Sequence, residues 1–154
     1  KLDFDAVAKL VDFYLAAGVK GFFANCLSSE MYSISEDERL ELTSFIVKHV
    51  KGRVPIVATG SFGLTIEDKA EFTKKIYATG IDAVILITGH FANIEDSDET
   101  LLYNFNKFLS VCSIASNMFS TGTYSSPFCF EIFLASSILT LSLSDINFDI
   151  FLST

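Results

Sequence analysis

Cysteine is scarce in this sequence, and its few positions lie far apart. The chain of 154 residues contains three cysteines, Cys26, Cys112 and Cys129, and no CxxC pair. An odd number of widely spaced cysteines does not support a disulfide framework or a zinc site with cysteine ligands. Such a pattern is typical of a reducing compartment, so we expect the protein in the cytoplasm.

Positive charge is also in short supply. Lysine and arginine together number 11 against 19 aspartates and glutamates, which gives a net charge of −8. Nucleic acids and anionic membranes attract clusters of Lys and Arg, so we expect neither as a partner. The basic residues fall on segments with a helical pattern, interspersed with acidic residues, and we interpret them as exposed helix faces.

The sequence further lacks a nucleotide-binding loop and a convincing membrane span. No GxGxxG or GxxxxGK[ST] motif follows a predicted strand, and "GSFG" at 60–63 is interpreted as a turn before a helix. The amphipathic, acidic start of the chain does not resemble a signal peptide. The most apolar segment, 127–143, is shorter than the roughly 20 residues that a spanning helix needs and contains Glu131.

What the sequence does contain, over residues 1–110, is a regular alternation of helix and strand. Apolar residues at helical spacing predict helices over 3–17, 35–52, 65–80 and 96–116, and apolar runs predict strands over 19–25, 54–60 and 82–89. Ser35 and Glu38 fit a capping box, and Thr65 and Asp68 open the following helix. Continuous apolar strands alternating with amphipathic helices predict an α/β fold with a parallel sheet. A doubly wound sheet and a (βα)8 barrel both satisfy this pattern.

Residues 111–154 have a different character. No Lys or Arg follows Lys107, and Ser, Phe, Leu and Ile dominate. We predict a strand over 115–124, a buried helix over 127–143 and another strand over 146–154. We interpret this tail as divergent from residues 1–110, in the manner of degraded or out-of-frame sequence.

Four segments in order resemble the dihydrodipicolinate synthase / N-acetylneuraminate lyase family of class I aldolases. They read "VAKLVDFYLAAGVKGFFAN", "NCLSSEMYSISEDERLEL", "GRVPIVATGS" and "YATGIDAVILITG". The resemblance covers about residues 3–110 and implies a (βα)8 barrel of the TIM type. The chain would form an incomplete barrel, from its first helix to about its sixth strand.

The resemblance also implies a chemistry. In this family a strand lysine forms a Schiff base with pyruvate or another 2-oxo acid, without an added cofactor, and the iminium accepts electrons while a carbon–carbon bond is made or broken. A tyrosine relays protons, and hydroxyl and N–H groups of the loop after the second strand hold the carboxylate. Barrel active sites lie at the C-terminal ends of the strands. The family commonly forms homo-oligomers.

Carried over to this sequence, the resemblance indicates four site residues. Ser28 and Ser29 lie in the carboxylate loop, although the first of the family's two hydroxyls is replaced by Leu27. His90 stands where the family often has a tyrosine, and we expect it to contact substrate as a proton carrier; the alternative is an ordinary exposed histidine. Tyr124 keeps the family's Tyr-x-x-Pro and is the expected catalytic relay tyrosine; the alternative is an ordinary strand tyrosine.

The lysine of the family is missing from its expected position. Ser153 takes that place, and every lysine lies at or before Lys107, on a predicted helix or its end. An exposed lysine has a pKa near ~10.4 and is charged at neutral pH, and we expect none of these lysines to be buried. Two functions therefore stay open: a lyase or synthase of the family, and an inactive truncated member. A phosphate-binding barrel is a third, for which no glycine-rich phosphate loop is found.

Overall fold

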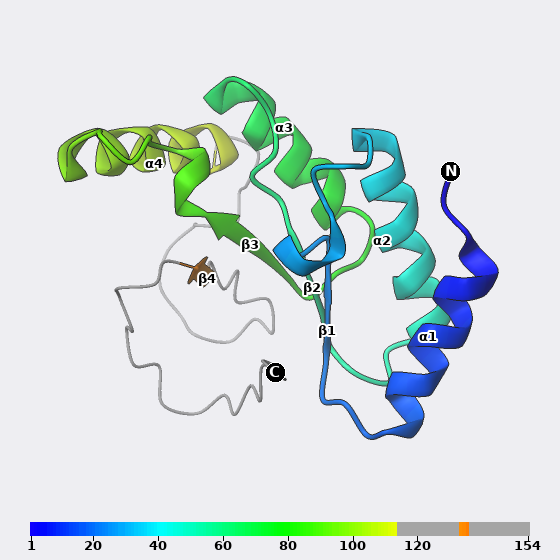
Figure 1. Ribbon diagram of the computed structural model, residues 1–154. Helices are drawn as coiled ribbons and strands as arrows, with labels where there is room; N and C mark the ends of the chain where they lie inside the picture. The colour runs from blue at the N-terminus through cyan, green and yellow to red at the C-terminus, as the bar shows by residue number, and fades with distance from the viewer. Residues whose placement is uncertain (114–132, 136–154) are drawn as a thin grey trace.

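The computed structural model describes residues 1–113 and 133–135. The chain alternates helices with strands, and two short 3-10 turns follow the first and third strands (Figure 1). In chain order the elements are α1 (Phe4–Ala16), β1 (Phe22–Ala24), η1 (Leu27–Ser29), α2 (Glu36–Val50), β2 (Ile56–Thr59), α3 (Ile66–Tyr77), β3 (Ala83–Ile87), η2 (Thr88–His90), α4 (Asp98–Ser113) and β4 (Phe133–Ala135).

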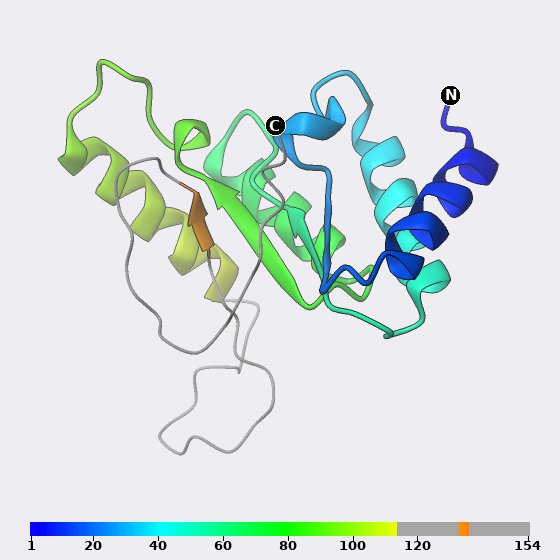
Figure 2. The same ribbon diagram turned by 60° about the horizontal axis from the view of Figure 1, so that its bottom comes forward.

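The strands form one parallel sheet in the order β1-β2-β3-β4, so the spatial order follows the chain order. Phe22 lies opposite Ile56, and Val57 lies opposite Ala83. A doubly wound sheet reverses its strand order and carries helices on both faces. Here the helices α1 to α4 follow one another around the outside of the sheet, as two views show (Figures 1 and 2). This order is that of a barrel wall, the architecture that the family resemblance implies.

The helices begin where the sequence predicts, because side chains satisfy their first N–H groups. Ser35 Oγ accepts a hydrogen bond from the Glu38 N–H at 3.2 Å, and Glu38 Oε2 accepts from the Ser35 N–H at 3.0 Å. Thr65 and Asp68 form the same reciprocal pair at the start of α3. Both capping boxes are thus confirmed, and each fixes where the chain turns from the end of a strand into a helix.

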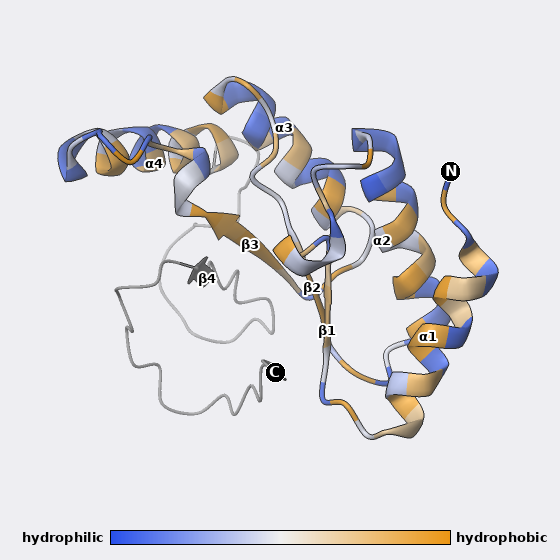
Figure 3. Cartoon of the chain, in the orientation of Figure 1, coloured by the Kyte–Doolittle hydropathy of each residue, from blue (hydrophilic) through white to orange (hydrophobic). Residues whose placement is uncertain are grey.

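The core lies between the sheet and the inward faces of the helices. Strand β3 is hydrophobic along its length, whereas the helices carry both hydrophobic and hydrophilic residues (Figure 3). The largest fully buried apolar side chains are Phe72, Phe108, Met31, Ile76, Leu86 and Val50. This burial holds α3 and α4 against β3 and thereby sets the loops that follow the strands.

The last strand corrects one prediction. Residues 127–143 are predicted as a buried helix, but Phe133–Ala135 pairs with β3 in parallel, with Ile85 opposite Phe133. A short apolar run fits a buried helix and a buried strand equally well, and here the open edge of β3 decides, because its backbone groups need partners. The rest of 127–143 and the predicted strands 115–124 and 146–154 lie outside the described residues. Among the helices that are described, none is long and apolar enough to cross a membrane.

The capping box of α2 gives a testable prediction. Replacing Ser35 by Ala removes the acceptor for the Glu38 N–H, and we expect the free energy of unfolding to fall by about 1 kcal/mol. Urea denaturation measures this change. The matched control is Ser33→Ala, because Ser33 is exposed and precedes the helix. Equal stabilities of the two variants would contradict the assigned role of the cap.

Candidate functional site

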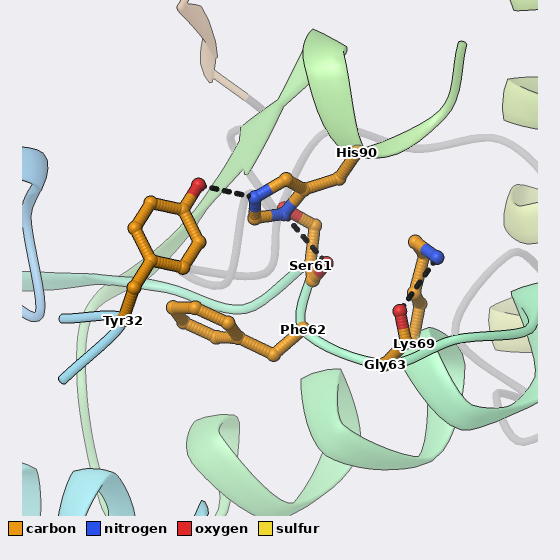
Figure 4. Close-up of a pocket in the computed structure, with 6 residues that line it drawn as sticks. All are labelled: Tyr32, Ser61, Phe62, Gly63, Lys69 and His90. Carbon is orange, nitrogen blue, oxygen red and sulfur yellow. Dashed lines mark hydrogen bonds between the residues drawn. The ribbon is translucent and has the colours of Figure 1, made fainter. Parts of the chain in front are cut away.

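A small pocket lies where the chain leaves β2 and β3 at their C-terminal ends. Its volume is about 250 Å³. The residues that line it come from the loops after η1, β2 and β3 and from the first turn of α3 (Figure 4); they are Tyr32, Ser61, Phe62, Gly63, Lys69 and His90. The C-terminal ends of barrel strands are where barrel active sites form, so this pocket is the candidate site.

Gly60 brings the loop after β2 close to β3. A Cβ atom at this position would collide with Val84 Cγ1, so only glycine permits the approach. The Gly60 N–H donates to the Ile85 carbonyl at 3.0 Å, and Thr73 Oγ1 donates to the Gly60 carbonyl at 2.8 Å. The next residue, Ser61, is thereby held fully buried at the base of the pocket.

His90 is fixed by hydrogen bonds to both of its ring nitrogens. Nδ1 lies 2.7 Å from the Ser61 carbonyl oxygen and 2.9 Å from Ser61 Oγ. A carbonyl oxygen only accepts, so Nδ1 carries a proton and donates it. In neutral imidazole the other nitrogen, Nε2, is then an acceptor, and the Tyr32 hydroxyl, 2.6 Å away, donates to it.

The surroundings keep His90 neutral. Burial lowers the pKa of His90, and the positive charges of Lys69 and Arg39 lower it further, while the hydrogen bond to the Ser61 backbone opposes the shift. Neutral His90 can accept the Tyr32 proton as the Tyr32 oxygen takes one from a ligand. The arrangement is a proton relay that opens into the pocket.

Lys69 corrects a second prediction. Its residue is only 6% exposed, although all lysines are predicted on exposed faces. Its Nζ donates to the carbonyls of Gly63 at 2.8 Å and Leu64 at 3.3 Å. Burial lowers the pKa of Lys69, against the opposing charge of Asp68. The sequence did contain a signal for the burial of Lys69, because Lys69, Thr73 and Ile76 lie on one helix face at positions i, i+4 and i+7.

Arg39 packs against Phe62, one of the residues that line the pocket. The Arg39 guanidinium lies 3.9 Å from the centre of the Phe62 ring, and its Nε donates to the Met31 carbonyl at 2.8 Å. Phe62 in turn packs against Tyr32 and His90, with ring centres 6.0 and 5.6 Å apart. These aromatic contacts therefore fix the positions of the Tyr32 and His90 rings relative to each other.

The predicted carboxylate loop lies in η1 and does not line the pocket. The Ser29 hydroxyl and N–H both donate to the Cys26 carbonyl, at 2.7 and 3.0 Å. Ser28 Oγ lies 3.0 Å from Cys26 Sγ. The structure thus brings His90 into the pocket together with Tyr32, Ser61 and Lys69, none of which was named as a site residue from the sequence. Tyr124 and Ser153 lie outside the described residues.

No metal centre is found in this region. Within residues 1–113 and 133–135, no three His, Cys, Asp or Glu side chains are arranged to hold a metal ion. The pocket offers hydroxyls, an imidazole and an amine, which are groups for proton transfer and for binding a polar ligand.

Comparison with known proteins identifies the fold family. Residues 1–117 match the Dihydrodipicolinate synthetase family. The chain belongs to this family. It is 29% identical to the 4-hydroxy-tetrahydrodipicolinate synthase of Bacillus subtilis over 113 residues, which is 73% of this chain and 38% of that protein. Against the same enzyme of Pseudomonas aeruginosa it is 31% identical over 91 residues, 59% of this chain and 31% of that protein.

Solved structures of this family share the fold. The dihydrodipicolinate synthase of Bacillus anthracis superposes with a TM-score of 0.64 at 22% identity, over 87% of this chain and 39% of that one. The enzyme of Acinetobacter baumannii, solved in complex with pyruvate, gives a TM-score of 0.63 at 24% identity, over 71% of this chain and 37% of that one. The expected incomplete TIM-type barrel is confirmed, and the chain spans about two fifths of its structural relatives.

The neutral state of His90 makes a prediction about pH and stability. An unfolded histidine takes up a proton near its ordinary pKa of about 6.5, whereas folded His90 does so only at lower pH. Stability is therefore full above this range and falls as the pH drops through it. We expect His90→Gln to reduce the loss of unfolding free energy between about pH 7 and pH 5.5, measured by urea denaturation.

The control for this experiment is the other histidine of the chain. His49 lies on α2, where Nε2 is 2.8 Å from Asp12 Oδ1, away from the pocket. In the variant His49→Gln, the free energy of unfolding should still show the part of its pH dependence that His90 causes. If the unfolding free energy of His90→Gln depended on pH as strongly as that of the unmodified chain, His90 would not be held neutral by the fold.

Proposed function

We propose that this chain carries a 2-oxo-acid site of an aldolase-type lyase or synthase acting on pyruvate or a related acid. The observation that carries the proposal is the Tyr32–His90 hydrogen bond, oriented by Ser61, which lines a pocket at the strand ends of a dihydrodipicolinate synthase family sheet. Complexes of solved family members with pyruvate support the substrate class. We place the activity in the cytoplasm and in a homo-oligomer, as the cysteine pattern and the family resemblance lead us to expect.

The proposed reaction begins with a lysine amine that adds to the C2 carbonyl of the acid. Water leaves and an iminium forms, which then accepts electrons as a carbon–carbon bond is made or broken. The addition and the loss of water both require proton transfer, which the Tyr32–His90 pair is placed to perform. Ser28 and Ser29 would contribute to binding the acid, and Tyr124 would be a further relay tyrosine.

A second candidate is a catalytically inactive member that binds the acid without reacting. One observation favours it, namely that no lysine follows Lys107, so that the family resemblance would put Ser153 in the place of the Schiff-base lysine. Serine has no amine to form the iminium. The two candidates share the pocket and differ only in whether a covalent adduct forms.

Borohydride trapping separates the two. The full chain is incubated with pyruvate and sodium borohydride, and its mass is measured intact and after digestion. If the chain is a lyase or synthase, we expect one reduced pyruvyl adduct on a lysine. The variant His90→Gln should form this adduct roughly 100-fold more slowly, because proton transfer is lost. Borohydride without pyruvate is the control. Binding of pyruvate without an adduct on the folded chain would establish the inactive candidate instead.

A further inference from the structure

One arginine contacts both the loop after β1 and the pocket. That loop carries Ser28 and Ser29, which the proposed function assigns to the acid, but these two residues do not line the pocket. The two parts of the site must still keep a fixed geometry, because proton transfer requires the reacting atoms at hydrogen-bond distance. Arg39, in the first turns of α2, is the residue that touches both.

Arg39 holds the loop 25–31 at its two ends. The Arg39 carbonyl accepts a hydrogen bond from Nδ2 of Asn25, the first residue after β1, at 3.2 Å. At the other end, Nε of Arg39 donates to the Met31 carbonyl at 2.8 Å. Asn25 and Met31 are both buried. The start and the end of the loop are therefore tied to one residue of α2.

The guanidinium of the same residue reaches the pocket. It lies 3.9 Å from the centre of the Phe62 ring, and this ring packs edge-to-face against Tyr32, with centres 6.0 Å apart. Figure 4 shows the Phe62 ring beside the Tyr32 ring, with the Tyr32 hydroxyl directed to His90. Tyr32 also directly follows Met31 in the chain. Arg39 thus acts on Tyr32 from two sides, through Met31 and through Phe62.

These contacts use properties that belong to arginine and not to lysine. A guanidinium is planar, so its face can lie on an aromatic ring while an N–H at its edge donates to a carbonyl. Among the described residues Arg39 forms no salt bridge. The other arginine of the chain, Arg53, lies 3.9 Å from Asp12. An ion pair therefore does not explain why arginine stands at position 39.

We propose that Arg39 is a positioning residue, whose guanidinium fixes the Tyr32 hydroxyl on His90 and holds the loop after β1 in a set geometry relative to this pair. The inference rests on the proposed function, since it names the residue that aligns the parts of that site. Arg39 acts through Met31 and Phe62, and no contact with the acid is needed. Without its guanidinium, the acid-binding loop and the proton carrier are both present but misaligned.

A purely electrostatic role is the alternative. The positive charge of Arg39 lowers the pKa of His90, and a lysine at this position would supply the same charge. The two roles therefore differ in the expected effect of Arg39→Lys. If only the charge matters, lysine replaces arginine fully; if the guanidinium positions Tyr32, lysine does not.

The first test is an NMR titration of the full chain without substrate, which follows the ring protons of its histidines. Arg39→Lys should raise the pKa of His90, because a displaced Tyr32 hydroxyl no longer donates to Nε2, and that hydrogen bond favours the neutral ring. In a chain that already carries Tyr32→Phe, the same substitution should have no effect, since the bond is absent from the start.

The matched control is Arg53→Lys. Arg53 also lies at the end of α2, and its Nε also donates to a backbone carbonyl, that of Val50, at 2.8 Å. This bond lies outside the pocket, so the pKa of His90 should stay unchanged. Full retention of the His90 pKa in Arg39→Lys would overturn the inference, as would an effect of Arg39→Lys that persists together with Tyr32→Phe.

The second test is the rate of borohydride trapping at saturating pyruvate. Arg39→Lys should form the adduct about 10- to 100-fold more slowly, because a misplacement of about 1 Å is enough to slow a positioned reaction by this factor. Arg53→Lys should react at the rate of the unmodified chain. A deficit that saturating pyruvate removes would reflect weaker binding alone and would overturn the positioning role.

The unmodified chain tests the inference even if Arg39→Lys does not fold. An Nε–H held by the Met31 carbonyl should exchange with water more slowly in the folded chain than in the chain unfolded by urea. Equal exchange rates in the two states would show that the guanidinium is not fixed and would overturn the inference.

The inference and the proposed function fail in distinguishable ways. If the unmodified chain forms no adduct, Schiff-base chemistry is excluded, and the titration of His90 still decides the role of Arg39. If the adduct forms at the same rate in Arg39→Lys and the pKa of His90 is unchanged, the proposed function is intact and the inference is overturned.

Discussion

The pocket depends on the hydrogen bonding between Ser61 and His90. These residues are 29 positions apart and belong to different strand-end loops. The parallel pairing of β2 with β3 brings the loops together, and Gly60 allows the final close approach. Because Nδ1 donates to the Ser61 carbonyl, the tautomer of His90, the direction of the Tyr32 hydrogen bond and the shape of the pocket follow from one contact.

The site places polar and charged groups where a fold built only for stability would place apolar ones. Lys69 lies on the inward face of α3 beside the fully buried Ala70, and burial, together with the charges of Lys69 and Arg39, lowers the pKa of His90. Each of these features costs free energy, which the surrounding packing must offset. Arg39 lies over the Phe62 ring, and Phe62 packs edge-to-face against the buried Phe72, so these contacts join the pocket to the core.

Local signals in the sequence were reliable because they depend on near neighbours. The capping boxes at Ser35 and Thr65 need only residues three positions apart, and both are formed. The apolar segment around Phe133–Ala135 had no such local determinant, and the edge of β3 made it a strand. The contacts of His90 could not be read from spacing, since Tyr32 precedes it by 58 residues. Ser28, Ser29 and Tyr124 stay predictions as site residues.

The sequence by itself determined the family, the alternation of helix and strand, and the positions at which the helices begin, because these follow from residue type and short spacing. The helix–strand pattern alone did not distinguish a doubly wound sheet from a barrel; the family resemblance implied the barrel, and the order of strands far apart in the chain confirms it. Only the tertiary structure decided that Lys69 is buried beside His90, because burial depends on which helix face meets the sheet.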